Sequence, residues 1–220
     1  MTNKPSRVLV TDFDGTMTRR DFFECVTEQL LQPEDMEPWH RYNAGKISHF
    51  EALQTIFSKL RFDESQLQPV LDQMGLDPRL AKAVDRLRQT GWEIVVVSNG
   101  CRWYIDRLLG AVKDLLTLYT NPGTLDPAQG LLMRRPVDSP YYGEATGIDK
   151  RLVVQDFLAR YDRVVFAGNG RPDVEPALLV EPANRFARGY LALELERCER
   201  IFRRFESWSE IADQLALRGN

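Results

Sequence analysis

The sequence predicts an α/β protein in which a three-layer, doubly wound parallel sheet carries an inserted, all-helical cap. Three short apolar runs, over residues 8–10, 94–97 and 164–167, have the length and aliphatic composition of buried strands. Segments with helical spacing separate these runs, and such alternation favours right-handed βαβ crossovers and a parallel sheet. A long helical stretch directly follows the first strand, and we interpret it as the insertion.

The insertion sets the expected domain boundaries. From Asp21 to about Leu76 apolar residues recur at helical spacing, and no segment in this region alternates like a strand. We therefore predict a core made of residues 1–17 and 79–220, and a helical cap made of residues 18–78.

The remaining elements alternate between helix and strand up to the end of the chain. Gly91 is placed to close the first of these helices as its C-terminal cap. Residues 119–148 are rich in Pro, Gly, Tyr and Asp, and we expect a hairpin or a long loop there. We predict helices over 80–89, 101–109, 150–160 and in two segments from about 189 onward, and strands over 115–118 and 184–187.

Composition narrows the class of protein. The chain has 220 residues, of which 43% are hydrophobic and 28% charged, as in ordinary globular domains. Its net charge of −3 provides no global basic field, so nucleic acid is not an expected partner. Three widely spaced cysteines without a CxxC motif favour reduced thiols and a cytoplasmic location. No apolar segment suggests a signal peptide or membrane span. The composition does not decide between a monomer and a homodimer.

The most informative motif is Asp12-Phe13-Asp14-Gly15-Thr16, directly after the first predicted strand. In open α/β sheets, ligands bind at the carboxyl ends of the strands. Two carboxylates at that place repel each other unless a cation lies between them. A plain acidic turn is the alternative, but the glycine and the hydroxyl side chain add a specificity that such a turn does not need. The motif therefore predicts a cation-assisted site.

Three further polar sites follow predicted strands or begin a predicted helix. They are Ser98-Asn99-Gly100, Lys150, and the pair Asn169 and Asp173. In a parallel sheet these sites converge on one edge, together with the two aspartates. Carboxylates hold Mg²⁺, whereas a hydroxyl, a backbone amide and a lysine suit phosphate oxygens. Considered separately, Ser98 fits equally well as the cap of a helix, and Lys150 fits equally well as a residue that faces solvent.

Together these residues resemble the four motifs of the haloacid dehalogenase (HAD) phosphatases, in the expected order over nearly the whole chain. The insertion resembles the small helical cap of the phosphoserine phosphatase-like branch. Segments 186–191 and 205–211 are similar to the subgroup that contains the methionine-salvage phosphatase acting on 2-hydroxy-3-keto-5-methylthiopentenyl-1-phosphate. The resemblance implies a HAD-like, Rossmannoid core.

The resemblance also implies a role for each matching residue. Asp12 is the nucleophile that forms an aspartyl-phosphate, and Asp14 is the general acid that protonates the leaving oxygen and later the base that activates water. Lys150 neutralises Asp12 and the phosphate. The expected phosphate- and substrate-binding residues are Thr16, Ser98, Asn99, Gly100, Asp21 and Glu24. The expected Mg²⁺ site comprises Asp12, Asp14, Asn169 and Asp173, with Asp173 orienting a metal-bound water or Lys150.

Asn169 departs from the family pattern, which has aspartate at this position. Its side-chain oxygen is still a possible Mg²⁺ ligand, but one formal negative charge is missing, so metal affinity is expected to fall. Three interpretations compete: a working site with a weaker hold on the metal, an inactivated variant that traps substrate, and a phosphometabolite-binding protein without turnover. We favour retained phosphatase chemistry. A phosphotransferase with another acceptor than water stays open.

The cap is expected to select the substrate and to exclude water. Asp21 and Glu24 lie where this branch carries a substrate-facing acid. We find no counterpart of the cap arginine that reads a carboxylate in phosphoserine phosphatases, and Gln54 falls near its place. We therefore expect a small phosphorylated metabolite with a partly apolar body, with phosphoserine as the alternative substrate. His40 and His49 are expected to be ordinary surface or boundary residues.

Overall fold

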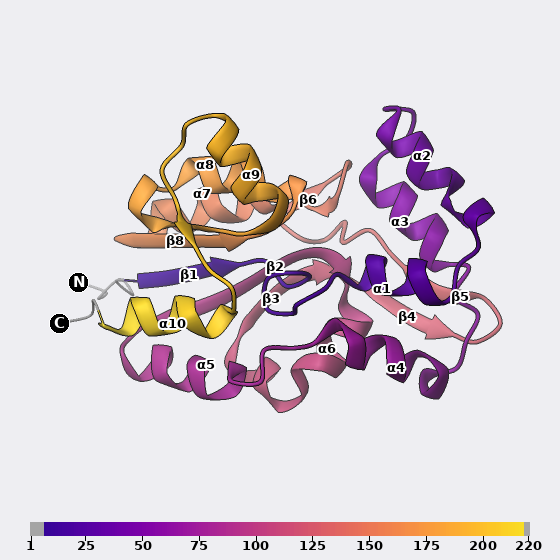
Figure 1. Cartoon of the computed structure of the whole chain (residues 1–220), viewed down its shortest axis with the longest axis horizontal. Coiled ribbons are helices and arrows are strands. Elements are labelled where there is room, and N and C mark those ends of the chain that lie inside the picture. Colours follow the sequence, from indigo (N-terminus) through magenta and orange to yellow (C-terminus); the bar gives the residue numbers. More distant parts are fainter. Residues whose placement is uncertain (1–6, 218–220) are drawn as a thin grey trace.

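A six-stranded parallel sheet forms the centre of the molecule in the computed structural model, which describes residues 7–217 (Figure 1). The strand order is β10-β9-β8-β1-β2-β3, and every neighbouring pair is parallel. These strands are β1 (Arg7–Thr11), β2 (Glu93–Cys101), β3 (Thr117–Asn121), β8 (Arg163–Gly168), β9 (Arg185–Ala187) and β10 (Arg203–Arg204). The strand order reverses beside β1, which places the first aspartate motif at the switch point of the sheet.

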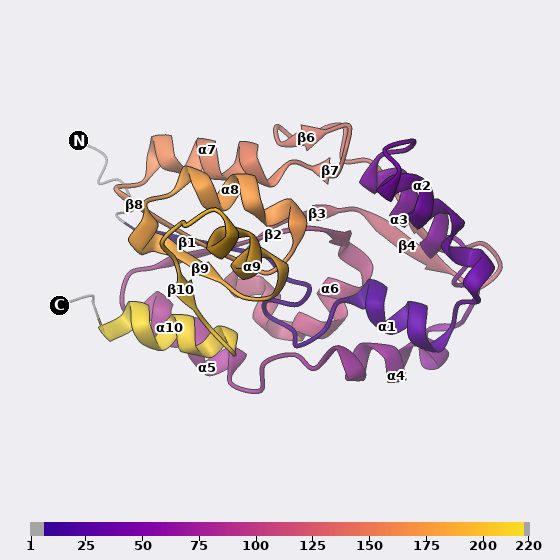
Figure 2. The ribbon, with the colours of Figure 1, turned by 45° about the horizontal axis from the view of Figure 1, so that its top comes forward.

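Helices cover both faces of the sheet, as Figures 1 and 2 show. On one face lie α7 (Lys150–Arg160), α8 (Val174–Leu179) and α9 (Gly189–Arg197); on the other lie α5 (Leu80–Gln89), α6 (Arg102–Leu109) and α10 (Trp208–Leu217). Short 3₁₀ turns complete this part: η2 (Gly110–Leu115), η3 (Arg171–Asp173) and η4 (Pro182–Asn184). The predicted doubly wound architecture is confirmed.

Side-chain alternation along β1 explains the three layers. Val8 and Val10 belong to the hydrophobic cluster under α7, α8 and α9, whereas Leu9 belongs to the cluster that contains α5, α6 and α10. Successive strand residues point to opposite faces, so a strand with three consecutive apolar residues fits only where both faces are covered. The second cluster continues into the cap, so cap and core share one buried apolar contact region.

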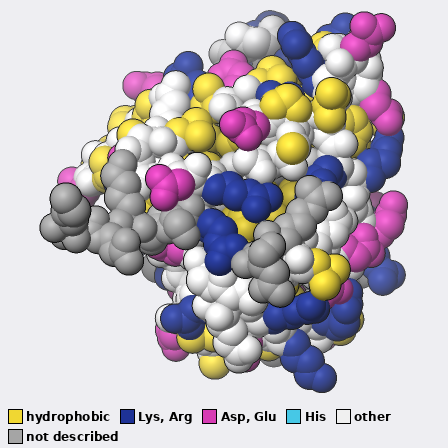
Figure 3. All heavy atoms as spheres, turned by 90° about the vertical axis from the view of Figure 1, so that its left-hand side faces the viewer, with side chains coloured by type: hydrophobic (Ala, Val, Ile, Leu, Met, Phe, Trp, Pro, Cys, Tyr) yellow, Lys and Arg dark blue, Asp and Glu magenta, His cyan; other side chains and the backbone are white. Residues whose placement is uncertain are grey.

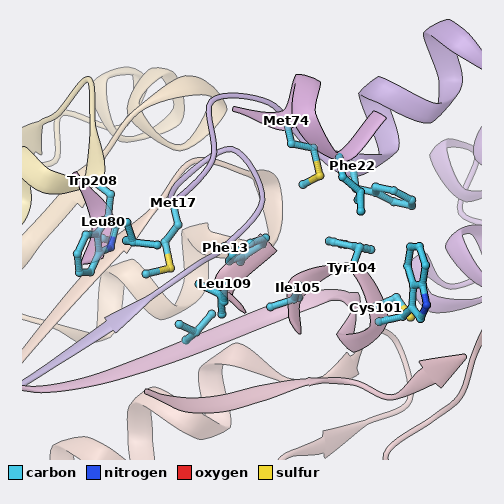
Figure 4. Packing of buried hydrophobic residues seen from close by; sticks show 14 of the residues in the cluster. Phe13, Met17, Phe22, Met74, Leu80, Cys101, Tyr104, Ile105, Leu109 and Trp208 are labelled. Carbon is cyan, nitrogen blue, oxygen red and sulfur yellow. The ribbon is translucent and has the colours of Figure 1, made fainter. Parts of the chain in front are cut away.

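The inserted segment forms α1 (Phe22–Gln29), η1 (Pro33–Met36), α2 (Glu37–Asn43), α3 (His49–Phe57) and α4 (Glu64–Met74). Its two ends meet, because Thr18 and Leu76 form an isolated β-bridge. Figure 4 shows Phe22 and Met74 from the cap above Tyr104 and Ile105 of α6, in the contact between cap and core.

The turn-rich segment holds two hairpins, in agreement with the predicted hairpin. They are β4 (Gly123–Asp126) with β5 (Gly130–Met133), and β6 (Tyr142–Gly143) with β7 (Gly147–Ile148). The first hairpin lies against α3, where the Gln54 side chain donates to the carbonyl of Met133 at 2.9 Å. The cap helices therefore rest partly on strands that the core contributes, which the expectation of an all-helical cap did not include.

Other predicted elements differ from the structure only at their ends. The helices expected over 80–89 and 150–160 agree with α5 and α7, whereas the strand expected over 115–118 begins and ends two or three residues later, as β3. The two-residue strand β10 had no prediction. It lies at the sheet edge, where Arg204 forms an ion pair with Glu196 of α9 at 2.5 Å.

The face opposite the cap carries charges of both signs. In Figure 3 several Lys and Arg side chains gather near the middle of this face, with hydrophobic and acidic side chains around them. Two arginines at the starts of β1 and β8 have a packing role, because Arg7 and Arg163 both lie over the ring of Trp92, at 5.5 and 5.2 Å. In the described part of the chain, no helix is long and apolar enough to cross a membrane.

Candidate active site

A cavity lies at the carboxyl ends of β1, β2 and β8, between the core and the cap. It encloses about 540 Å³ including its opening to solvent, within the usual range of small-molecule sites. Core residues at its base are Asp12, Asp14, Ser98, Asn99, Gly100, Tyr104, Lys150, Asn169, Gly170 and Pro172; the cap side adds Asp21, Phe23, His49, Leu53 and Phe57. The four polar sites that the sequence analysis singled out therefore meet at one place.

Lys150 joins two of these sites through a buried ion-pair triad. Its ammonium lies 2.8 Å from Oδ1 of Asp12 and 2.7 Å from Oδ1 of Asp173. The side chain is only 4% exposed and belongs to the first residue of α7, which Asp149 caps by accepting the backbone N–H of Arg151. A buried charge needs such partners, so Lys150 is a fixed part of the site and does not face solvent.

Burial and charge act in opposite directions on this triad. Burial raises the pKa of Asp12 well above its ordinary value, repulsion by Asp173 adds to this, and Lys150 opposes it. Burial alone lowers the pKa of Lys150, but the carboxylates of Asp12 and Asp173 outweigh it and raise that pKa. The lysine therefore stays cationic and favours the ionised form of Asp12, which a nucleophile requires.

Asp14 is held from two sides. Its Oδ2 accepts hydrogen bonds from the Tyr104 hydroxyl at 2.8 Å and the Ser98 hydroxyl at 3.3 Å, and its Oδ1 accepts the backbone N–H of Phe22 at 3.1 Å. Burial raises the pKa of Asp14 above its ordinary value, although these hydrogen bonds oppose the shift. A raised pKa suits a carboxyl group that must carry a proton to a leaving oxygen.

Gly100 makes room for this arrangement. A Cβ atom at this position would lie 1.8 Å from the Tyr104 hydroxyl and 2.7 Å from Oδ2 of Asp14. Its backbone N–H donates to the Ser98 hydroxyl at 2.9 Å, which leaves the hydroxyl proton for Asp14. The side chain of Asn99 donates to the carbonyl of Ile148 at 2.6 Å, so the end of β2 is tied to β7, the strand before α7.

Asn169 lies beside the two aspartates, and its amide fits this place in two orientations. One amide atom lies 2.7 Å from the carbonyl oxygen of Asp14, 3.3 Å from Oδ2 of Asp12 and 2.9 Å from the Thr16 hydroxyl. With nitrogen in that position the amide donates to all three. With oxygen there, oxygens of Asp12, Asp14 and Asn169 converge with no proton between them, as the ligands of a hard cation do.

The donor set therefore fits Mg²⁺, with one carboxylate, one backbone carbonyl and one amide oxygen. In the described residues, no group of three or more His, Cys, Asp or Glu side chains is arranged to hold a metal ion, in keeping with the amide at position 169. Both oxygens of Asp173 already have partners: Oδ1 contacts Lys150, and Oδ2 accepts the backbone N–H groups of Asn169 and Gly170 at 2.9 and 2.8 Å. Asp173 therefore shapes this loop and orients Lys150.

Two predicted substrate-binding residues lie elsewhere. Glu24 is on the exposed side of α1, where it faces Arg20 at 3.9 Å with a side chain 53% exposed. Thr16 is buried, contacts the Asn169 amide and does not line the cavity. Asp21 does line the cavity, and burial with repulsion by Asp14 and Glu24 raises its pKa to about 7. Of the two cap acids, only Asp21 is placed to meet a substrate.

Two lining residues were missed or misjudged in the sequence. Tyr104, which the sequence analysis did not assign to the site, contacts Asp14 directly. His49, expected to be an ordinary surface or boundary residue, is half-buried and lines the cavity together with Phe23, Leu53 and Phe57. The signal for Tyr104 was its position on the helix after Ser98, whereas nothing in the sequence separated His49 from His40.

The fold and the site define a phosphatase of the haloacid dehalogenase class. A family model described as putative phosphatase matches residues 7–194, and the chain belongs to this family. A HAD family hydrolase from Salmonella enterica has the same fold, with a TM-score of 0.67 and 16% identity over 94% of this chain and 69% of that one. A phosphoserine phosphatase from T. onnurineus gives a TM-score of 0.63 and 17% identity over 98% of both chains.

Curated relatives include two kinds of phosphatase. The 2-hydroxy-3-keto-5-methylthiopentenyl-1-phosphate phosphatase of Bacillus velezensis is 23% identical over 96% of this chain and 89% of its own length. The phosphoserine phosphatase of Vibrio cholerae is 24% identical over 76% of this chain and 51% of its own length. The chain is thus a phosphoric monoester hydrolase related to the methionine-salvage subgroup.

Proposed function

We propose that the protein is a Mg²⁺-dependent phosphatase that hydrolyses a small phosphate ester with an uncharged, partly apolar body through an aspartyl-phosphate. The buried triad of Asp12, Lys150 and Asp173 beside Asp14 is the observation that carries this proposal. It places a nucleophile, its countercharge and a proton donor in one cavity. The methionine-salvage ester named for several relatives is one substrate of this kind.

In the proposed mechanism Asp12 attacks phosphorus, and the bond from phosphorus to the leaving oxygen breaks as Asp14 delivers its proton to that oxygen. Asp14, now ionised, takes a proton from the water that hydrolyses the aspartyl-phosphate and regenerates Asp12. Lys150 keeps a positive charge beside the nucleophile and the phosphate throughout. Oxygens of Asp12, Asp14 and Asn169 would hold Mg²⁺, which supplies charge neutralisation for the phosphoryl group.

The walls of the cavity support the proposed substrate class. Phe23, Leu53 and Phe57 form an apolar cap side, and Lys150 is the only cationic side chain among the lining residues. This lysine is already paired with Asp12 and Asp173, so a carboxylate on the substrate would meet no free cation there. An ester such as phosphoserine is therefore disfavoured relative to one with a neutral body. Three free cysteines, two of them buried, support the proposed reducing, cytoplasmic location.

Phosphate release from a panel of esters, with and without Mg²⁺, tests the function. We expect Mg²⁺-dependent release that Asp12→Asn abolishes, and a preference for esters with neutral, partly apolar bodies. A clear preference for phosphoserine would contradict the proposed substrate class. The absence of release from every ester, with the wild type and with Asn169→Asp, would contradict the proposed function.

A second candidate function, binding of a phosphometabolite without turnover, is favoured by the amide at position 169. The variant Asn169→Asp decides between the two. Since a carboxylate binds a hard cation better than an amide, we expect the variant to need roughly tenfold less Mg²⁺ for half-maximal activity or thermal stabilisation. Turnover by the variant alone would assign loss of activity in the wild type to Asn169. Turnover by both proteins would exclude a pure binding role.

A further inference from the structure

His49 begins α3 and presents its ring to the cavity from the cap side. Ser48 fixes this helix end, since its hydroxyl accepts the backbone N–H of Glu51 at 3.2 Å. The imidazole meets the rings of Trp39 and Tyr42 edge to face, with centroids 5.9 and 5.2 Å away. These contacts hold the ring by its apolar surface and leave the two nitrogens to be satisfied otherwise.

One ring nitrogen has no partner in the described part of the chain. Among residues 7–217, Nδ1 of His49 is buried and has no hydrogen-bond partner. A buried donor or acceptor without a partner lowers the stability of a protein. Within the described part of the chain, Oδ1 of Asn99 is likewise buried without a hydrogen-bond partner, and Asn99 also lines the cavity. These two unpaired polar atoms belong to residues that line one cavity, and a ligand seated against both side chains could complete the hydrogen bonding.

The position of His49 places it against the body of a substrate. Besides the catalytic cavity it lines an adjoining cavity, and Asn99, Lys150 and Pro172 line both. An ester whose phosphate contacts Asp12 and Lys150 can direct its body along the wall that His49 shares with Leu53 and Phe57. The imidazole is the uncharged polar side chain that the cap contributes to this wall.

Charge further limits what His49 can recognise. Burial and the nearby charge of Lys150 lower its pKa to about 4, so the ring is neutral at physiological pH. A neutral imidazole offers one N–H donor and one acceptor nitrogen. The neutral ring of His49 therefore matches an uncharged oxygen function better than a carboxylate or a second phosphate. Asp21, which lines the same cavity, would also repel either of these anions.

We propose that His49 is a specificity-determining residue, which hydrogen-bonds to a hydroxyl or carbonyl oxygen on the otherwise apolar body of the phosphate ester. This inference rests on the proposed function and adds to it the chemical group of the substrate that the cap recognises. Phe23, Leu53 and Phe57 accommodate the carbon chain on either side of that oxygen.

Calorimetric binding to the Asp12→Asn protein with Mg²⁺ tests the inference without turnover. The probes are pentyl phosphate and its 2-hydroxy, 2-oxo and 3-hydroxy derivatives, which differ in one oxygen. We expect at least one oxygenated ester to bind roughly 3- to 10-fold more tightly than pentyl phosphate, as one hydrogen bond provides. His49→Leu in this background should remove that preference. His40→Leu is the matched control, since His40 is exposed on α2, and should leave it unchanged.

Equal affinity for all four esters would overturn the inference, as would a preference that survives His49→Leu or an equal loss of affinity for every probe. Should His49→Leu unfold, His49→Gln replaces it, and this variant should retain part of the preference because the amide still donates and accepts. A His49-dependent preference in a protein that releases phosphate from no ester would refute the proposed function alone. Phosphate release without such a preference would refute only the role of His49.

Discussion

At the scale of single residues, the contact between Tyr104 and Asp14 decides how the proton donor is aligned. The phenol is fully buried and stacks on Phe22, with ring centroids 4.2 Å apart and planes 17° from parallel. Its hydroxyl reaches Oδ2 of Asp14 across the space that Gly100 leaves free. We therefore infer that Tyr104 is a positioning residue for Asp14, the proposed general acid.

Removing this hydroxyl by Tyr104→Phe should lower kcat roughly 5- to 10-fold for alkyl esters and leave KM nearly unchanged. The effect should be much smaller for p-nitrophenyl phosphate, whose leaving group departs without a proton. Steady-state kinetics on both substrates measures the split. Tyr161→Phe is the control, because its hydroxyl bonds to Glu93 at the far end of β2. Equal losses on both substrates would argue for a general packing defect.

The carboxyl group of Asp21 predicts a pH dependence of stability. Its folded-state pKa of about 7 lies above the ordinary value of 3.8, so the folded protein binds this proton more tightly than the unfolded chain. The free energy of unfolding should therefore fall as pH rises from about 4 to 7 and level off above. Asp21→Asn should reduce this slope, to which the raised pKa values of Asp12 and Asp14 also contribute, and stabilise the protein at pH 8, by on the order of 1–3 kcal/mol.

Urea unfolding between pH 4 and 8 without divalent ions measures this effect. Glu24→Gln, on the exposed side of the same helix, should keep the wild-type slope. An unchanged slope in Asp21→Asn would assign the pH dependence of stability to other carboxyl groups.

The sequence predicted the core of the site because each motif follows a strand, and parallel strands bring their ends together. Residues on the cap were harder to place. Residues three positions apart share a helix face, which would place Asp21 and Glu24 together. Asp21, however, is the N-cap of α1 and has an extended backbone, so it lines the cavity while Glu24 faces solvent. The exposure of His40 and the cavity position of His49 depend on how α2 and α3 pack, which periodicity alone does not define.

At the scale of elements, the hairpin of β4 and β5 is a support for the cap. Gly130 lies against the end of α3 with a positive φ of 96°, and a Cβ atom there would lie 2.2 Å from the carbonyl oxygen of Ser58. The Gln54 side chain, expected near a substrate-reading position, bonds instead to the hairpin at Met133. The hairpin fixes where α3, and with it His49, stands over the cavity.

Gly130→Ala should therefore destabilise the contact between hairpin and cap, by about 2–4 kcal/mol from strain and overlap together. Hydrogen exchange should become faster in α3 while α5 and α7 keep their protection. Gly45→Ala is the matched control, because Gly45 has a φ of 70° but open space around it. A similar loss in both variants would show that backbone strain alone is responsible.

Local sequence patterns defined most elements, but not those that depend on distant partners. Apolar periodicity defined α5 to the residue, since its buried residues Leu80, Ala83, Val84 and Leu87 recur at helical spacing. Strand β10 has only two residues, Arg203 and Arg204, whose charges gave no strand pattern. It exists because β9 offers an edge for pairing, and pairing with a distant edge is not visible in a local window.

At the scale of the whole molecule, Arg188 connects segments from both ends of the sequence. Its guanidinium donates to the carbonyls of Gly15 at 2.6 Å, Thr18 and Arg19 at 2.9 Å, and Glu206 at 2.7 Å. The Arg188 side chain thus joins the loop after β1, the segment that leads into the cap and the segment before α10. The methylene stem and charge of this residue keep three otherwise separate stretches of backbone together.

Arg188→Ala should lower the free energy of unfolding by about 2–4 kcal/mol, since several carbonyls lose a charged donor at once. This corresponds to a fall in Tm of roughly 4–16 °C. We also expect a lower kcat, because the loop that carries Asp14 loses its anchor. Differential scanning calorimetry and kinetics measure both effects. Arg204→Ala, which removes an exposed ion pair with Glu196 and a contact with the Phe202 ring, should change Tm by little.

The hydrogen bond from the backbone of Phe22 to Asp14 has a consequence for the timing of the reaction. Phe22 is the first residue of α1, so this N–H belongs to the cap although its acceptor belongs to the core. Any displacement of α1 stretches the bond and leaves the carboxyl group held from the Tyr104 side alone. We therefore expect a cap movement that admits substrate or water to weaken the support of the proposed acid as well, so that the proton donor is fully assembled only when the cap is closed over the cavity.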